Sequence, residues 1–167
     1  MHLTKEEIHA KWQWIYELGL ELLPHHGGEI WNSTGYVDEH DKLPWSTVTD
    51  LRMVRMGGGR QNGKTAWLGK FFKEHPKSYC ITVNKDMRNY FISQYCDDNN
   101  FGYHRVFTVM DLITIAKTKP EWMKETFAKA SHLLIDDASY NHAIHSPGFI
   151  KMMDGLFNKN IIVTAMG

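Results

Sequence analysis

The chain has 167 residues, which is enough for one domain with a sizeable buried core. A hydrophobic fraction of 43% and an aromatic fraction of 13% argue for a globular protein and against a disordered one. Lysine plus arginine and aspartate plus glutamate each number 19, so the net charge of zero gives no electrostatic sign of nucleic-acid binding, although a local basic patch stays open.

The cysteines and the N-terminus bear on the cellular compartment. Cys80 and Cys96 belong to no C-x-x-C pair, so we expect buried thiols in a reducing environment. The first residues carry no signal-peptide apolar run, and no stretch approaches the ~18 apolar residues that span a bilayer. These features predict a cytoplasmic protein that has no membrane partner.

The first predicted element is a helix over residues 5–23. Thr4 and Glu7 have the spacing of a capping box, and the helix should end before Pro24. Apolar residues recur at helical spacing: Ile8, Trp12, Ile15, Leu18 and Leu22. We expect this apolar face to cover the sheet or another subunit, and we expect the aromatic residues of the helix to pack rather than to mark a partner surface.

Residues 24–50 are rich in glycine, proline and other turn formers, which predicts an irregular extension. A loop of this length is unusual in a compact domain unless it has a function. Trp31, Tyr36 and Trp45 either stack on an adenine base or fold back onto the core, and we favour the core because large aromatic side chains usually anchor it.

Residues 57–65 read Gly-Gly-Gly-Arg-Gln-Asn-Gly-Lys-Thr, and from Gly58 they match the phosphate-binding pattern G-x-x-x-x-G-K-[ST]. A predicted strand at 51–56 precedes the match and a predicted helix at 66–74 follows it, as this pattern requires. Lys64 supplies a positive charge for the β- and γ-phosphates, and the Thr65 hydroxyl suits Mg²⁺. The residues expected to bind ATP are Gly58, Gly59, Arg60, Gln61, Asn62, Gly63, Lys64, Thr65 and Ala66.

The rest of the chain alternates between strands and helices. The predicted segments are strand 78–83, helix 84–95, strand 105–109, helix 110–117, a helix from Pro120, strand 132–136, a helix from Pro147 that Asn158 and Lys159 cap, and strand 161–164. This alternation predicts a three-layer α/β fold with a mostly parallel five-stranded sheet and an N-terminal helix. We expect one domain over 1–167, in which 1–50 form the helix and irregular extension and 51–167 form the nucleotide-binding core.

An apolar run that ends in an acidic pair, Leu133-Leu134-Ile135-Asp136-Asp137, has the Walker B pattern. Parallel sheets place ligands at the carboxyl ends of their strands, so both acids should emerge at the site. We expect Asp136 to hold Mg²⁺ and Asp137 to orient the attacking water. His142 and His145 have a spacing that would also suit a metal, but without a third ligand nearby we interpret them as surface histidines.

Together these motifs resemble the ATPase domain of the large terminase subunits, the viral DNA-packaging motors. Residues 60–65 are similar to their R-Q-x-G-K-[ST] loop, residues 133–137 to their Walker B site, and Thr164-Ala165, after the last strand, to their coupling motif. The resemblance implies a P-loop NTPase of the additional-strand, RecA-like class. It also implies that Arg60 acts on the γ-phosphate as an arginine finger, for which a planar guanidinium is suited.

The chain departs from this family at two points. Asp137 stands where terminases carry glutamate, and the shorter side chain predicts slower hydrolysis. The 167 residues also end at the coupling motif without a nuclease domain, so we do not expect the usual packaging activity from this chain alone. A stripped-down relative, a regulator of another ATPase and a component completed by a partner stay open.

The leading hypothesis is a Mg²⁺-dependent ATP-binding protein that hydrolyses ATP, in which Lys64, Arg60 and Asp137 take the catalytic roles and Thr65 and Asp136 hold the metal. A small nucleotide or nucleoside kinase is one alternative, and a non-catalytic ATP-binding module that acts through a partner is another. DNA binding, a homo-oligomer and a larger ATPase or nuclease partner stay open. A viral protein of this kind would act in the host cytoplasm.

Overall fold

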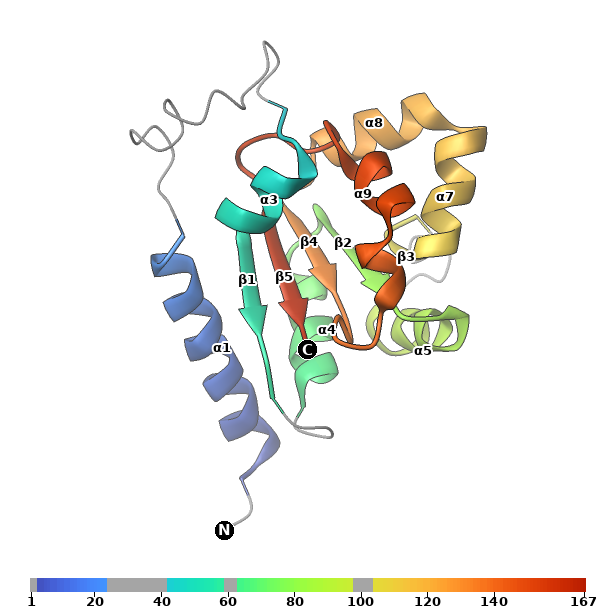
Figure 1. The fold of residues 1–167 in the computed structure, drawn as a ribbon. Helices are drawn as coiled ribbons and strands as arrows, with labels where there is room; N and C mark the ends of the chain where they lie inside the picture. Colours follow the sequence, from blue (N-terminus) through green and yellow to red (C-terminus); the bar gives the residue numbers. More distant parts are fainter. Residues whose placement is uncertain (1–2, 24–41, 59–62, 98–103) are drawn as a thin grey trace.

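The computed structural model describes residues 3–23, 42–58, 63–97 and 104–167 (Figure 1). Within them, five strands form one sheet in the order β1-β5-β4-β2-β3, and all four strand pairs are parallel. The strands are β1 (Met53–Met56), β2 (Ser78–Thr82), β3 (Val106–Thr108), β4 (His132–Ile135) and β5 (Ile162–Met166). The predicted α/β class and the parallel five-stranded sheet are confirmed.

Helices cover both faces of this sheet. They are α1 (Lys5–Glu21), α3 (Trp45–Leu51), α4 (Lys64–Glu74), α5 (Lys85–Tyr95), α7 (Val109–Thr118), α8 (Pro120–Ala128) and α9 (Pro147–Met153), with a 3-10 turn, η1 (His142–His145). Successive strand residues point to opposite faces: Leu134 packs with α1, α4 and α5, whereas Leu133 and Ile135 pack with α3, α7, α8 and α9. We call these the α4 face and the α9 face. No helix among the described residues is long and apolar enough to cross a membrane.

The N-terminal helix is part of the α4 face. Thr4 and Glu7 form the predicted capping box, and the helix ends at Glu21, two residues before the predicted end. The ring of Tyr16 lies 5.4 Å from that of Trp67 in α4. A Cβ on Gly19 would lie only 2.5 Å from a methyl group of Val54, so α1 approaches β1 very closely. The helix covers the sheet as predicted, but it does so through Trp12 and Tyr16. The predicted apolar face is wrong in part, because Ile15, Leu18 and Leu22 are exposed.

Residues 45–51 form α3, so the predicted irregular extension is wrong over residues 45–50. The strand predicted over 51–56 begins only at Met53, as β1. Pro44 precedes the first turn, where its missing N–H costs nothing. Trp45 is only 4% exposed, and its ring packs against Phe149 and Phe157. Trp45 therefore lies in the core, as favoured, while Trp31 and Tyr36 fall outside the described residues.

Two further predictions near the end of the chain need correction. Helix α9 ends at Met153 and does not reach the predicted cap at Asn158, because Gly155 takes a left-handed φ of 70° and the chain turns back into the core. Strand β5 continues to Met166, so Thr164 is fully buried inside the strand and does not leave its carboxyl end. Of the two free cysteines, Cys80 is buried as predicted and Cys96 is only half-buried.

Candidate functional site

The glycine-rich segment joins β1 to α4 at the carboxyl edge of the sheet. Gly57 and Gly58 follow β1, and Gly63 precedes Lys64, the first residue of α4. Gly63 has a left-handed φ of 79°, and a Cβ there would lie 2.7 Å from Cγ2 of Ile8 in α1. Glycine is therefore required by both the backbone and the neighbouring helix. The predicted ligands at positions 59–62, Arg60 among them, lie outside the described residues.

The ammonium group of Lys64 points back across the start of this segment. Its Nζ donates to the carbonyl oxygen of Gly58 at 2.9 Å and also to the carbonyl oxygen of Gly167. Gly167 directly follows β5. The lysine charge is thereby held at the point where β1 and β5 end, and Ala66 lies exposed in the same first turn of α4.

Thr65 and Asp136 are 71 residues apart in the chain and in direct contact. The Thr65 hydroxyl lies 3.2 Å from Oδ1 and 3.3 Å from Oδ2 of Asp136. Asp136 directly follows β4, and its backbone N–H donates to Ile81 in β2, which fixes the carboxylate at the strand end. The structure therefore brings together the two residues that the sequence analysis assigned to Mg²⁺.

Burial changes the chemistry of the Asp136 carboxylate. The residue is 2% exposed, and removal from water raises its pKa to about 6; the negative charge of Asp137 acts in the same direction. Hydrogen bonds from the Thr65 hydroxyl and the Asp137 amide, and the charge of Lys64, lower the pKa but do not offset the effect of burial. A cation on this carboxylate would supply the missing charge compensation.

Asp137 directly follows Asp136, is partly exposed and lies in a tight turn. Its φ of 49° is left-handed, a conformation that aspartate adopts more readily than most residues. Its N–H donates to Oδ1 of Asp136 at 3.1 Å, and its carbonyl oxygen accepts from the N–H groups of Tyr140 and Asn141. This turn holds the backbone of Asp137 directly beside Asp136.

Strand β5 lies between β1, which precedes the glycine-rich segment, and β4, which precedes Asp136 and Asp137. The N–H of Gly167 donates to the carbonyl oxygen of Met56 at 2.9 Å, and the N–H of Ala138 donates to that of Met166 at 2.6 Å. These bonds tie the ends of β1, β5 and β4 together. The carbonyl oxygen of Gly167 was not predicted as a lysine partner, because backbone groups leave no sequence signal.

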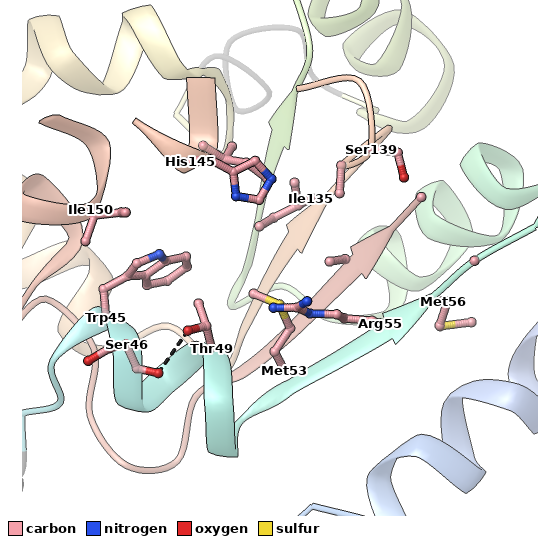
Figure 2. Close-up of a pocket in the computed structure, with 15 residues that line it drawn as sticks. Trp45, Ser46, Thr49, Met53, Arg55, Met56, Ile135, Ser139, His145 and Ile150 are labelled. Atoms are coloured by element: carbon pink, nitrogen blue, oxygen red, sulfur yellow. Dashed lines mark hydrogen bonds between the residues drawn. The ribbon is translucent and has the colours of Figure 1, made fainter. Parts of the chain in front are cut away.

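A second feature that the sequence analysis missed is a cavity on the α9 face at the same edge of the sheet (Figure 2). Its volume is about 440 Å³. Trp45 and His145 line it, together with Arg55 of β1. No group of three His, Cys, Asp or Glu side chains that could hold a metal occurs in the described part of the chain.

Comparison of the chain with protein families and with curated proteins finds no match to either. We therefore derive the function from the residues of the site themselves.

Proposed function

We propose that this protein binds ATP with Mg²⁺ and hydrolyses it, as a P-loop NTPase similar to the terminase ATPase domain. The observation that carries the proposal is the contact between Thr65, at the start of α4, and the buried Asp136, beside the ammonium group of Lys64. A hydroxyl and a carboxylate in contact, with a lysine directly before the hydroxyl residue at a helix start, provide the polar groups that a metal-bound triphosphate needs.

The phosphates would lie at the N-terminal end of α4. The first N–H groups of α4, an 11-residue helix, point at this position. They have no side-chain cap, because the N-cap residue Gly63 has no side chain. Lys64 would exchange the carbonyl oxygens of Gly58 and Gly167 for phosphate oxygens. The exchange of the Gly58 carbonyl oxygen is favourable because a phosphate carries full negative charge and a carbonyl does not.

The donor set fits Mg²⁺. Thr65 and Asp136 offer hard oxygen atoms, and the remaining ligands of an octahedral ion are normally waters and phosphate oxygens. The raised pKa of Asp136 marks a carboxylate that is poorly compensated in the protein alone. When bound, the metal would neutralise charge on the phosphates; the chain itself would hold the metal with Asp136 and the triphosphate with Lys64.

The strand order supports assignment to the additional-strand class. The sheet places β5 between β1, which leads to the glycine segment, and β4, which leads to Asp136. An added strand between these two is the feature for which that class is named. For hydrolysis, Asp137 would orient the attacking water, and Arg60 keeps the role that the resemblance implies.

The kinase alternative loses support from the arginines that it would need. Such kinases use a lid rich in arginines, and after position 60 the sequence contains only Arg88 and Arg105. Arg88 forms an ion pair with Asp111 at 2.7 Å, and Arg105 donates to the carbonyl oxygens of Phe72, His75 and Ser78. Both guanidinium groups therefore hold neighbouring elements together.

A module that binds ATP without turnover is the second candidate, and Asp137 favours it. Its backbone is held in the turn by Tyr140 and Asn141, and its side chain is one methylene shorter than the expected glutamate. Both features limit how far its carboxylate reaches toward the phosphates.

The test measures binding and turnover separately, with a fluorescent ATP analogue and with phosphate release, in the presence and absence of Mg²⁺ and of single- and double-stranded DNA. We expect Mg²⁺-dependent binding that Lys64→Ala abolishes, whereas Lys70→Ala, an exposed lysine on the same helix, retains it. Unchanged affinity in Lys64→Ala would refute the proposal. Binding with turnover equal to the Lys64→Ala blank would select the module, and stimulation by DNA would support the relationship to packaging motors.

A further inference from the structure

The cavity on the α9 face has the dimensions of a ligand site. It lies between α3, the η1–α9 segment and the carboxyl ends of β1, β5 and β4 (Figure 2). A volume of about 440 Å³ falls within the range of sites that bind small organic molecules. None of Lys64, Thr65 and Asp136 lines it, so the groups proposed to bind ATP and Mg²⁺ lie outside the cavity.

Most of the lining is apolar. The apolar side chains are those of Trp45, Met53, Met56, Ile135, Ala138, Ile144, Ile150 and Ala165. An indole ring and a thioether among branched side chains favour a flat aromatic group, because rings stack on rings and sulfur contacts ring edges well. The rim adds the hydroxyls of Ser46 and Ser139, while the Thr49 hydroxyl already donates to the carbonyl oxygen of Ser46 at 2.9 Å.

Arg55 adds a positive charge to the mostly apolar lining of the cavity. It lies on β1, and Figure 2 shows its guanidinium beside Met53, whose sulfur accepts from Nε at 3.3 Å. A thioether is a weak acceptor, and Arg55 forms no ion pair with any other described residue. A planar guanidinium can donate two parallel hydrogen bonds to a carboxylate or a phosphate, so the cavity can bind an anion through Arg55.

We propose that this cavity binds a small aromatic anion, a carboxylate or a phosphate monoester, whose charge lies on Arg55 and whose ring lies against Trp45 and Met53. The inference does not depend on the proposed ATP site, which lies where α4 begins on the other face of the sheet. The two sites share one residue: Gly167 lines the cavity, and its carbonyl oxygen accepts from Lys64.

The test titrates the full chain with 1-naphthoate, 1-naphthyl phosphate and the uncharged 1-naphthalenemethanol, with intrinsic tryptophan fluorescence and ligand-observed NMR as readouts. Both anions should bind about tenfold or more tightly than the alcohol, because a hydrogen-bonded charge adds at least that factor. The tighter of the two anions identifies the natural charged group. Equal affinity for all three compounds would overturn the proposal.

Two variants locate the binding. Arg55→Gln should lower the affinity for the anions to that for the alcohol, and Arg55→Lys should restore part of it. Thr49→Phe fills the cavity from the half-exposed side of α3 and should abolish binding of all three compounds. Thermal melting establishes that each variant is folded, and anion binding that neither Arg55→Gln nor Thr49→Phe weakens would refute the assignment.

Competition separates this site from the nucleotide site. Saturating Mg²⁺-ATP should leave naphthoate bound, and Lys64→Ala should bind naphthoate within about twofold of the unaltered protein, since Lys64 does not line the cavity. Complete displacement by Mg²⁺-ATP would show that the cavity belongs to the nucleotide site and would overturn the proposal. Loss of ATP binding with naphthoate binding intact would refute only the proposed function.

Discussion

The two faces of the sheet present opposite chemistry at the same edge. On the α4 face, Lys64, Thr65 and Asp136 are polar, close together and bonded to the protein itself. On the α9 face, the cavity is mostly apolar, and within the described residues its arginine donates to a methionine sulfur and forms no ion pair. A ligand on the α4 face must replace hydrogen bonds that the protein makes to itself, whereas a ligand on the α9 face meets the charged guanidinium of Arg55. The faces should therefore respond differently to ligands, to pH and to substitution.

The largest expected effect concerns the ammonium group on the α4 face. Lys64→Ala should weaken Mg²⁺-ATP binding about 100-fold or more, because it removes a charge-assisted contact to phosphate at a helix start. Titration of a fluorescent ATP analogue measures this loss. The same variant should bind naphthoate normally, and equal losses of both ligands would remove the distinction between the faces.

Asp136 should make stability depend on pH. Its pKa is about 6 in the folded protein, above the value of about 4 for an unfolded aspartate. Between these values the folded state binds more protons, so stability falls as pH rises from about 4 to 6 and stays reduced above 6. At pH 7.5 the charged, buried Asp136 should lower the unfolding free energy by roughly 2–3 kcal/mol. Asp136→Asn should therefore raise the melting temperature by several degrees at pH 7.5 and should have little effect at pH 4.

Addition of Mg²⁺-ATP should make the unaltered protein more stable than Asp136→Asn at pH 7.5. The unaltered protein should gain thermal stability from the ligand, and Asp136→Asn should gain little, because the neutral amide holds the metal poorly. Differential scanning calorimetry at both pH values, with and without ligand, measures all four states. An Asp136→Asn variant that is no more stable than the unaltered protein at pH 7.5 would contradict the raised pKa.

Gly63→Ala tests the backbone of the α4 face. The left-handed φ and the 2.7 Å approach to Ile8 should together cost about 2 kcal/mol of unfolding free energy, measured by urea denaturation. Gly148→Ala is a matched control, since a Cβ there meets nothing within 4 Å. In the double variant with Ile8→Ala, the part of the cost that comes from the contact should disappear, apart from the separate loss of the Ile8 side chain.

The smallest expected effect belongs to the α9 face. Arg55→Gln should change the unfolding free energy by less than about 0.5 kcal/mol, because the side chain is exposed and forms no ion pair within the described residues. Only its affinity for aromatic anions should change. A large loss of stability would mean that the arginine is a structural group rather than a binding group.

The predictable parts of the structure are those with local signals. The capping box of Thr4 and Glu7, the glycines before Lys64 and the acids after an apolar run each depend on neighbouring residues. Helix α3 was missed because the turn formers around it outnumber its own seven residues. The end of α9 was missed because Leu156 and Phe157 continue the apolar pattern after the backbone has already turned.

The cavity had no such signal. Its lining comes from α3, β1, β4, β5 and the η1–α9 segment, and only the fold brings these together. In the sequence, Arg55 is an ordinary residue in a strand of alternating burial. Its charge becomes part of a candidate binding site only because Trp45 and Ile135, from other elements, line the same cavity. Long-range packing of this kind is not encoded in the spacing of neighbouring residues.

The close packing of α1 on β1 has a consequence for solubility. Strand β1 is at one end of the described sheet and pairs only with β5, so the backbone groups along its outer side have no strand partner. Such an edge is a template for strand addition by another chain. Helix α1 runs alongside β1 in Figure 1, with Gly19 against the side chain of Val54, and we expect it to hinder strand addition at this edge. A chain without α1 should aggregate through β1, whatever happens at the ligand sites.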